Sequence, residues 1–126
     1  MTPNDELETA AMQTAEALLE RMNHTRAVVI ATEDGFHVAS AMRETLDASR
    51  LAAIASSMSA IGDVVTRETS LGTVRCLMIE AEDGYLVMRA TKRHSVGLVI
   101  AALTSREALL GLVIHGVGHA AQELAK

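Results

Sequence analysis

Two histidines four residues apart are the first side chains of this sequence whose spacing could support chemistry. His115 and His119 fall in a segment with helical periodicity, so both imidazoles would lie on one helix face, where such a pair can bind zinc. The Glu of an H-E-x-x-H motif is replaced by Gly116, and no Cys or group of carboxylates completes the site. A surface or partly packed histidine pair is the favoured interpretation, and the sequence predicts no bound metal.

The same segment contains the letters of a dinucleotide fingerprint, "GVGHAA" at residues 116–121. That fingerprint needs a strand before it and a βαβ unit around it, whereas here it lies inside a helical pattern with five residues after it. Gly116 and Gly118 are better explained as places where a helix packs close to a neighbour. The sequence therefore predicts no nucleotide cofactor.

The single cysteine is the remaining candidate nucleophile. Cys76 alternates with Val74 and Met78 in an apolar stretch, a position typical of a buried structural thiol. His37 and His94 lie near predicted turns and could assist a base, but no Ser or Cys has a nucleophile motif such as G-x-S-x-G around it. We expect no enzymatic activity.

Two acidic Asp-Gly pairs, in "EDGF" at residues 33–36 and "EDGY" at residues 82–85, could be metal-holding loops or hairpin turns. A metal loop needs several more oxygen ligands at fixed spacing, and neither copy has them. Asp-Gly favours tight turns, and the flanking apolar runs supply strands on both sides. We therefore expect hairpin turns at Asp34 and Gly35 and at Asp83 and Gly84.

Composition narrows the function classes. The 126 residues are 49% hydrophobic, which is enough for a core and predicts one domain over residues 1–126. A net charge of −5 and 2% aromatic residues oppose nucleic-acid binding. The single cysteine and the lack of a signal sequence predict a cytoplasmic protein, and no apolar run approaches the roughly 20 residues that cross a bilayer, so no membrane insertion is expected.

Hydrophobic periodicity predicts three helices and five strands in the order α-β-β-α-β-β-β-α. The helices are expected at residues 5–22, at residues 48–68 after the N-cap Asp47, and from a capping box at residues 104–107 to about residue 125. The strands are expected at residues 26–32, 36–42, 73–79, 85–90 and 96–103.

The connections between these strands predict the topology. Short connections join strands one and two, three and four, and four and five, so these neighbours should be antiparallel. The first and fifth strands are the most apolar and should lie together at the centre. The expected fold class is α/β of the α+β type, with a five-stranded antiparallel sheet in the order 2-1-5-4-3 and helices on its faces.

The third strand then lies at an edge, although "TVRCLMIE" is apolar on both faces. An exposed edge strand of this kind usually finds a partner. The second helix before it carries two stripes. One has large residues that we expect in the core, namely Leu51, Ile54, Met58, Ile61 and Val65. The other has small residues, namely Ala53, Ser57, Ala60 and Val64.

The small-residue stripe could be an Ala-rich solvent face or a site of close helix-to-helix contact. We favour the contact, because a two-fold axis would set the helix against its own copy and pair two copies of the edge strand. The expected dimer interface consists of Ala53, Ser57, Ala60, Val64, Arg75 and Leu77.

A basic cluster follows the fourth strand, formed by Lys92, Arg93 and His94 together with Arg89. Such a cluster is more often a solvated bend than a contact for an acidic partner. The seven methionines are interpreted as core filler and not as an adaptable binding groove.

These features resemble those of the Roadblock / dynein light chain family. The resemblance rests on the element order, the hairpins "VVIATEDGFHVAS" and "IEAEDGYLVMRA", the small-residue helix "LAAIASSMSAIGDVV" and the closing strand "VGLVIAAL", and covers about Leu7 to Leu124. It implies a longin-like or profilin-like sheet that dimerises through the second helix and third strand. Stand-alone bacterial and archaeal members, the MglB type among them, are associated with small Ras-like GTPases as regulators or scaffolds, so the resemblance implies such a partner.

Two functions follow as hypotheses. The favoured one is a non-enzymatic homodimeric adaptor for a small Ras-like GTPase or an associated signalling complex. The alternative is a small-molecule sensor, which would need an internal cavity with convergent polar groups. The scarcity of aromatic residues and of polar residues with a buried pattern disfavours the sensor.

Overall fold

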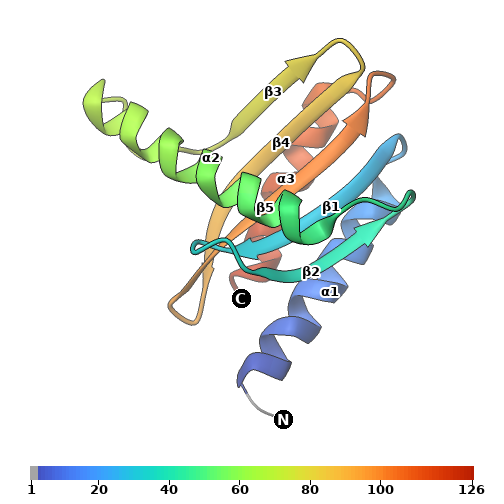
Figure 1. The fold of residues 1–126 in the computed structure, drawn as a ribbon, viewed down its shortest axis with the longest axis horizontal. Helices are drawn as coiled ribbons and strands as arrows, with labels where there is room; N and C mark the ends of the chain where they lie inside the picture. Colours follow the sequence, from blue (N-terminus) through green and yellow to red (C-terminus); the bar gives the residue numbers. More distant parts are fainter. Residues whose placement is uncertain (1–2) are drawn as a thin grey trace.

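A computed structural model describes residues 3–126 of the chain (Figure 1). The elements follow the predicted order α-β-β-α-β-β-β-α. They are α1 (Pro3–Arg21), β1 (Thr25–Thr32), β2 (His37–Met42), α2 (Ala48–Glu68), β3 (Leu77–Ala81), β4 (Gly84–Arg93), β5 (Val96–Ser105) and α3 (Leu110–Leu124).

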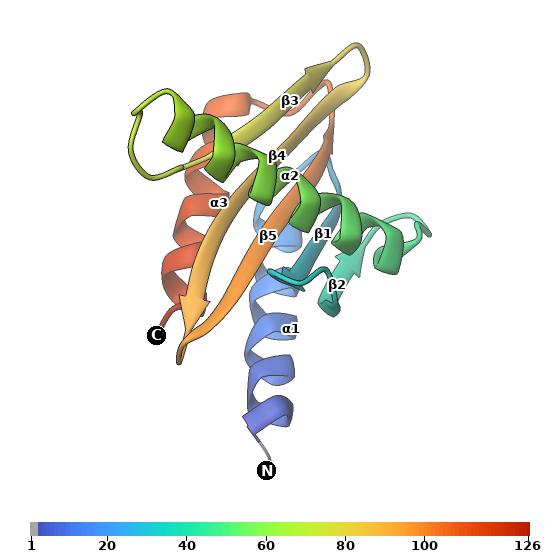
Figure 2. The same ribbon diagram turned by 60° about the vertical axis from the view of Figure 1, so that its left-hand side comes forward.

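The five strands form one antiparallel sheet in the order β2-β1-β5-β4-β3, which confirms the predicted topology. Helices α1 and α3 cover one face of the sheet and α2 crosses the other, as Figures 1 and 2 show from two sides. The central pair β1 and β5 is the most buried, because both strands are covered on both faces. Residues Val28, Ile30, Leu98 and Ile100 face α1 and α3, whereas Val99 faces α2.

Both Asp-Gly segments join neighbouring antiparallel strands, but the predicted turn position is wrong for Gly84. In the first turn Gly35 has φ +97°, and the amide of Thr32 donates to the carbonyl of Phe36 at 2.9 Å. In the second hairpin Ala81 pairs with Gly84, so Glu82 and Asp83 form the turn and Gly84 begins β4. A Cβ on Gly84 would lie 2.0 Å from the carbonyl oxygen of Thr104, so this strand position accepts only glycine.

Two predicted boundaries are wrong. The expected capping box at residues 104–107 does not start a helix, because Thr104 and Ser105 still belong to β5, where Thr104 pairs with Thr25 and Tyr85. Helix α3 begins at Leu110, and Leu109 before it provides no side-chain cap. The third strand was expected at residues 73–79 but runs from Leu77 to Ala81, because only this part of the segment lies against β4.

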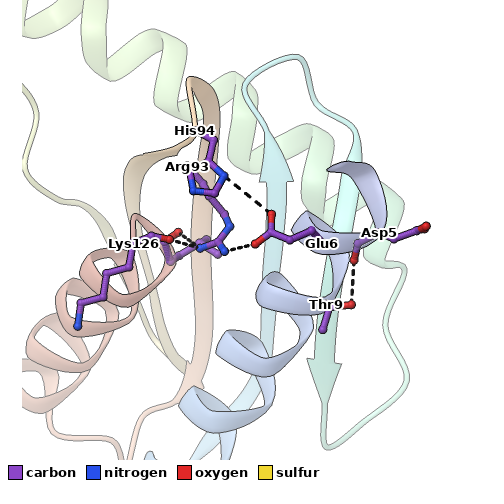
Figure 3. Close-up of polar contacts among 7 residues, drawn as sticks. Asp5, Glu6, Thr9, Arg93, His94 and Lys126 are labelled. Carbon is purple, nitrogen blue, oxygen red and sulfur yellow. Dashed lines mark hydrogen bonds and ion pairs between the residues drawn. The ribbon is translucent and has the colours of Figure 1, made fainter. Parts of the chain in front are cut away.

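The basic cluster at the end of β4 was expected to be a solvated bend, but one of its residues makes specific contacts. The Arg93 side chain is only 13% exposed and donates from Nη1 to the carbonyls of Leu124 at 2.9 Å and Lys126 at 2.7 Å. Its Nη2 forms a hydrogen bond and ion pair with the Glu6 carboxylate, and His94 Nδ1 lies 3.9 Å from the other Glu6 oxygen (Figure 3). Arg93 thus joins the first turn of α1 to the carbonyl end of α3.

Glu6→Gln is expected to lower the thermal stability at neutral pH and to lose that effect in acid. The hydrogen bond from Arg93, followed by the charges of Arg93 and His94, holds the pKa of the Glu6 carboxyl below its ordinary value of 4.5. A group whose pKa is lowered by folding contributes stability above its unfolded pKa and loses it as the pH falls through the folded value. The difference in Tm between wild type and variant should therefore be present at pH 7 and shrink below pH 4.5.

Glu8→Gln is the matched control, because Glu8 is exposed on the same helix and forms no ion pair among the described residues. A difference in Tm that is equally large for both variants, or that does not change with pH, would contradict the role given to Glu6.

Candidate protein-interaction site

Helix α2 contacts the sheet mainly through its small residues. Of the predicted core stripe, Leu51 and Met58 pack against the core, whereas the prediction is wrong for Ile54, Ile61 and Val65. The residues that α2 buries are Ala52, Ala55, Ser56 and Gly62. A Cβ on Gly62 would lie 2.8 Å from Leu77 Cδ1, and the Ser56 hydroxyl donates to the carbonyl of Thr32 at 2.7 Å. Because these side chains are short, the helix lies close to the sheet, and Ile54, Ile61 and Val65 remain exposed.

The large apolar residues of α2 lie instead in an exposed surface that continues onto β3. Most of the residues that were expected in the core are exposed: Ile54 by 43%, Ile61 by 62% and Val65 by 49%. We define the α2–β3 surface by the exposed large apolar residues of α2, of the connection and of the α2 side of β3, namely Ile54, Ile61, Val64, Val65, Leu71 and Ile79. Met78 pairs with Val87 and lies on the opposite face of the sheet, with α1 and α3. An exposed apolar surface of this extent marks an interaction site in a soluble protein.

The residues predicted for the dimer interface lie in or beside this surface. Ala53, Ser57 and Ala60 are exposed on the outer side of α2, and Val64 is 47% exposed. Arg75 is also exposed, in the segment that leads into β3, and lines the groove described next. Leu77 differs, because its half-buried side chain packs with Met58 and Leu86 in the core beneath α2. The same side chain also lines the floor of the groove described next.

A groove of about 710 Å³ lies between the C-terminal half of α2 and the chain that returns to β3. Figure 1 shows this half of α2 extending past β3, with the connection looping back to the strand. The groove is lined by Ile61, Val65, Leu71, Val74 and Cys76, among others. Cys76 was expected to be buried but is half-buried in the wall of this groove, and its partial burial raises the pKa of the thiol.

The backbone of β3 adds a second kind of binding group. This strand is the last in the sheet and pairs only with β4, from Leu77 opposite Met88 to Ala81 opposite Gly84. Its outer edge therefore presents unpaired N–H and C=O groups beside the exposed side chains of Met78 and Ile79. An edge strand next to an apolar groove can accept a further strand and a further helix together.

Sequence reasoning missed Leu71 and assigned Ile54, Ile61 and Val65 to the core. The face that contacts the sheet, with Ala52, Ala55, Ser56 and Gly62, lies on neither of the two stripes that the sequence indicated. Gly62 was the useful clue, since a glycine in a helix interior usually has a packing reason and marks the face that lies closest to the sheet.

The histidine pair and the glycines of the fingerprint lie on α3. His119 Nε2 lies 4.0 Å from the Glu123 carboxylate, and within residues 3–126 no group of three or more His, Cys, Asp and Glu side chains could hold a metal. The glycines of the fingerprint lie at close contacts, as expected. A Cβ on Gly116 would lie 2.8 Å from Met22 Sδ, and one on Gly118 would lie 2.9 Å from Arg89 Nη1. No helix in the described part of the chain is both long and apolar enough to span a bilayer.

Solved structures share this fold at low sequence identity. The Roadblock/LC7 domain from Streptomyces avermitilis superposes with a TM-score of 0.79 at 22% identity, covering 89% of this chain and 92% of that one. The gliding protein MglB from Thermus thermophilus superposes with a TM-score of 0.81 at 15% identity, covering 99% and 90%. Myxococcus xanthus MglB gives 0.75 at 16% identity, covering 99% and 89%.

No curated protein sequence matches the chain significantly. The model of the Roadblock/LC7 domain matches residues 12–107, which extend from α1 to the end of β5 and include the whole α2–β3 surface. With this match over most of its length and with the fold of the solved Roadblock structures, the chain belongs to the Roadblock/LC7 domain family.

Proposed function

We propose that this protein is a non-enzymatic, cytoplasmic adaptor of one domain that forms a homodimer through the α2–β3 surface and regulates or scaffolds a small Ras-like GTPase or an associated signalling complex. The observation that carries the proposal is the combination of an exposed apolar helix and an open strand edge on one side of the molecule. The GTPase partner rests on family membership alone.

The proposed dimer has two-fold symmetry. A two-fold axis beside β3 would pair two copies of this strand and continue the sheet across both protomers. The same axis would bring the outer faces of two α2 helices together, where Ala53, Ser57 and Ala60 allow a close approach. Ile61 and Val65 would then leave water, and each fully buried aliphatic side chain of this kind contributes about 1.5–3 kcal/mol.

The interior of the molecule supports the adaptor over the sensor. The cavity between α2 and the sheet, lined by Val29, Leu51, Ala55 and Leu86 among others, has a volume of about 20 Å³. That is space for about one water molecule, whereas ligand sites usually measure about 300–1,000 Å³. The hollows of ligand size, with volumes of about 320 to 710 Å³, lie at the surface and not between α2 and the sheet, and the groove at the α2–β3 surface suits a protein partner.

The proposal has two parts that can be tested separately. Light scattering of the purified chain at micromolar concentration should give the mass of a dimer, and a stable monomer would refute the proposed interface. Ras-like GTPases from the native cell, loaded in turn with GDP and with a non-hydrolysable GTP analogue, should bind the immobilised dimer with a preference for one state. If a confirmed dimer binds neither the GDP-loaded nor the GTP-analogue-loaded GTPases, the proposed GTPase partner is refuted, whereas the proposed dimer is not.

A further inference from the structure

An uncovered part of the sheet lies beside α2, at the end where β3 turns into β4. Leu86 packs beneath α2, and its pairing with Ile79 and Leu103 places all three side chains on the α2 side of the sheet. Together with Ala81 they line a hollow of about 320 Å³, which we call the hairpin-end hollow. Ile79 is 43% exposed and Ala81 is exposed, and Figure 2 shows the β3–β4 hairpin extending past α2. Helix α2 therefore leaves this hollow open.

The C-terminal end of α2 projects past the edge of its own sheet. The helix crosses β3 where Gly62 lies over Leu77, with a Cβ on Gly62 only 2.8 Å from Leu77 Cδ1. Because β3 is the last strand, the residues after Gly62 extend beyond it, as Figure 1 shows. From Gly62 to Glu68 the helix extends roughly 9 Å, which is about two spacings between neighbouring strands. In a dimer whose sheet continues across β3, this projection must lie over the sheet of the second copy.

An apolar side chain is held at the tip of the projection. The amide of Leu71 donates to the carbonyl of Thr66 at 2.9 Å. The amide of Ser70 donates to the carbonyl of Arg67 at 3.4 Å, and Ser70 has φ +58°. These are the hydrogen bonds and the left-handed residue of a Schellman motif, whose apolar residue frequently packs back on its own helix. Leu71 is instead 73% exposed, and with its backbone fixed it would lose little conformational entropy on binding.

The two-fold axis of the proposed dimer directs this projection to the hairpin-end hollow. Antiparallel pairing of the whole of β3 with its own copy sets Leu77 opposite Ala81 of the second copy. Because α2 crosses β3 at Leu77, the end of the helix continues over Ala81 of the second copy and then over its β4. Ala81 and the start of β4 are the residues that line the hollow.

A stable dimer also needs more contact than the strand edge provides. Such interfaces usually involve about 20–30 residues of each partner, whereas β3 has five, Leu77–Ala81. The hollow is continuous with the α2–β3 surface, since Ile79 belongs to both. The projection and the hollow thus supply further apolar surface directly beside the paired strands.

We propose that Leu71 and the C-terminal end of α2 of one copy occupy the hairpin-end hollow of a second copy, and that the symmetry repeats this contact in the opposite sense. Each copy then contributes one projection and one hollow, so the hollow is closed only in the dimer. The inference rests on the two-fold dimer proposed above and specifies a contact within it.

Disulfide cross-linking within the dimer tests the contact directly. In a Cys76→Ser background, a chain with Leu71→Cys and a size tag is co-expressed with an untagged chain that carries Ala81→Cys. Mild oxidation should give a disulfide-linked pair of one tagged and one untagged chain. Ala90→Cys is the matched control in place of Ala81→Cys, because Ala90 is exposed on the same face of the sheet, toward the other end of β4.

Light scattering of the unoxidised protein distinguishes failure of the contact from failure of the dimer. If the protein is a dimer but Leu71→Cys links to Ala81→Cys no faster than to Ala90→Cys, the contact is overturned and the two-fold dimer is not. A monomeric protein would overturn both.

Leu71→Ser gives a second test. It should raise the dissociation constant of the dimer by about tenfold or more, as expected when an apolar anchor is lost. Leu109→Ser is the matched control, because Leu109 is 68% exposed and lies before α3, outside the α2–β3 surface and the hollow. Both leucines are exposed, so circular dichroism should show intact folding in both variants. Equal dissociation constants for the two variants would contradict the contact.

Discussion

Ala60→Arg should convert the proposed dimer into a monomer. Ala60 is exposed on α2, so an arginine there has room in the single molecule and should leave the fold intact. At the proposed two-fold contact the change would occur twice, and it would place two long, like-charged side chains where two helices must lie close together. We expect the dissociation constant of the dimer to rise by about a hundredfold or more, measured by light scattering across a dilution series.

Ser49→Arg is the matched control, because Ser49 is exposed at the start of α2, which lies over β2 and far from β3 (Figure 1). Ile61→Arg distinguishes the two sides of the helix. If Ile61→Arg separates the protomers and Ala60→Arg does not, the contact uses the groove side of α2 and the small-residue stripe is a solvent face. If neither substitution changes the mass, the interface lies elsewhere.

The topology was predictable because it depends on features that a sequence displays. Short connections force antiparallel neighbours, and the unbroken apolar character of residues 26–32 and 96–103 identifies the two central strands. These signals are averaged over whole elements and tolerate errors of a few residues. The strand order was therefore correct although the third strand was placed four residues too early at its start and two at its end.

The orientation of α2 was not predictable in the same way. Periodicity indicated one stripe of large and one of small residues on this helix, but the residues that pack on the sheet, Ala52, Ala55, Ser56 and Gly62, belong to neither stripe. The preference for large residues in a core led to the wrong choice, because close packing of Ala52, Ala55 and Gly62 against the sheet outweighed it. The same error hid the main part of the candidate site, since the large residues form it.

Local signals also failed where long-range pairing opposed them. Thr104 and Glu107 have the spacing of a capping box, yet the hydrogen bonds of β5 to strands on both sides keep residues 104 and 105 in the sheet. The position of Arg93 could not be inferred either, because its partner Glu6 is 87 residues away in the sequence. Only the folded chain brings the first turn of α1, the end of β4 and the end of α3 together.

Gly84→Ala should be the most destabilising of the substitutions considered, with a loss of about 3 kcal/mol or more in the free energy of unfolding. The methyl carbon would lie 2.0 Å from the carbonyl oxygen of Thr104, 3.0 Å from its carbon and 3.2 Å from the carbonyl carbon of Ser105. All three are backbone atoms of β5, so relief of the clash would require the pairing of β4 with β5 to shift. The backbone of Gly84 also has φ +156°, which an alanine rarely adopts.

Gly72→Ala separates these two causes. Gly72 has φ +90°, but a Cβ there would meet no atom within 4 Å. This variant should therefore show only the backbone strain, about 1–2 kcal/mol, in urea unfolding followed by circular dichroism. If the two variants lose equal stability, the positive φ angle alone explains the loss at Gly84. The close contact with Thr104 would then be removed by a small shift that costs no free energy. A larger loss of stability at Gly84 would show that the close pairing of β4 with β5 requires this glycine. The glycine of the second Asp-Gly pair would then be needed by the strand and not by the turn.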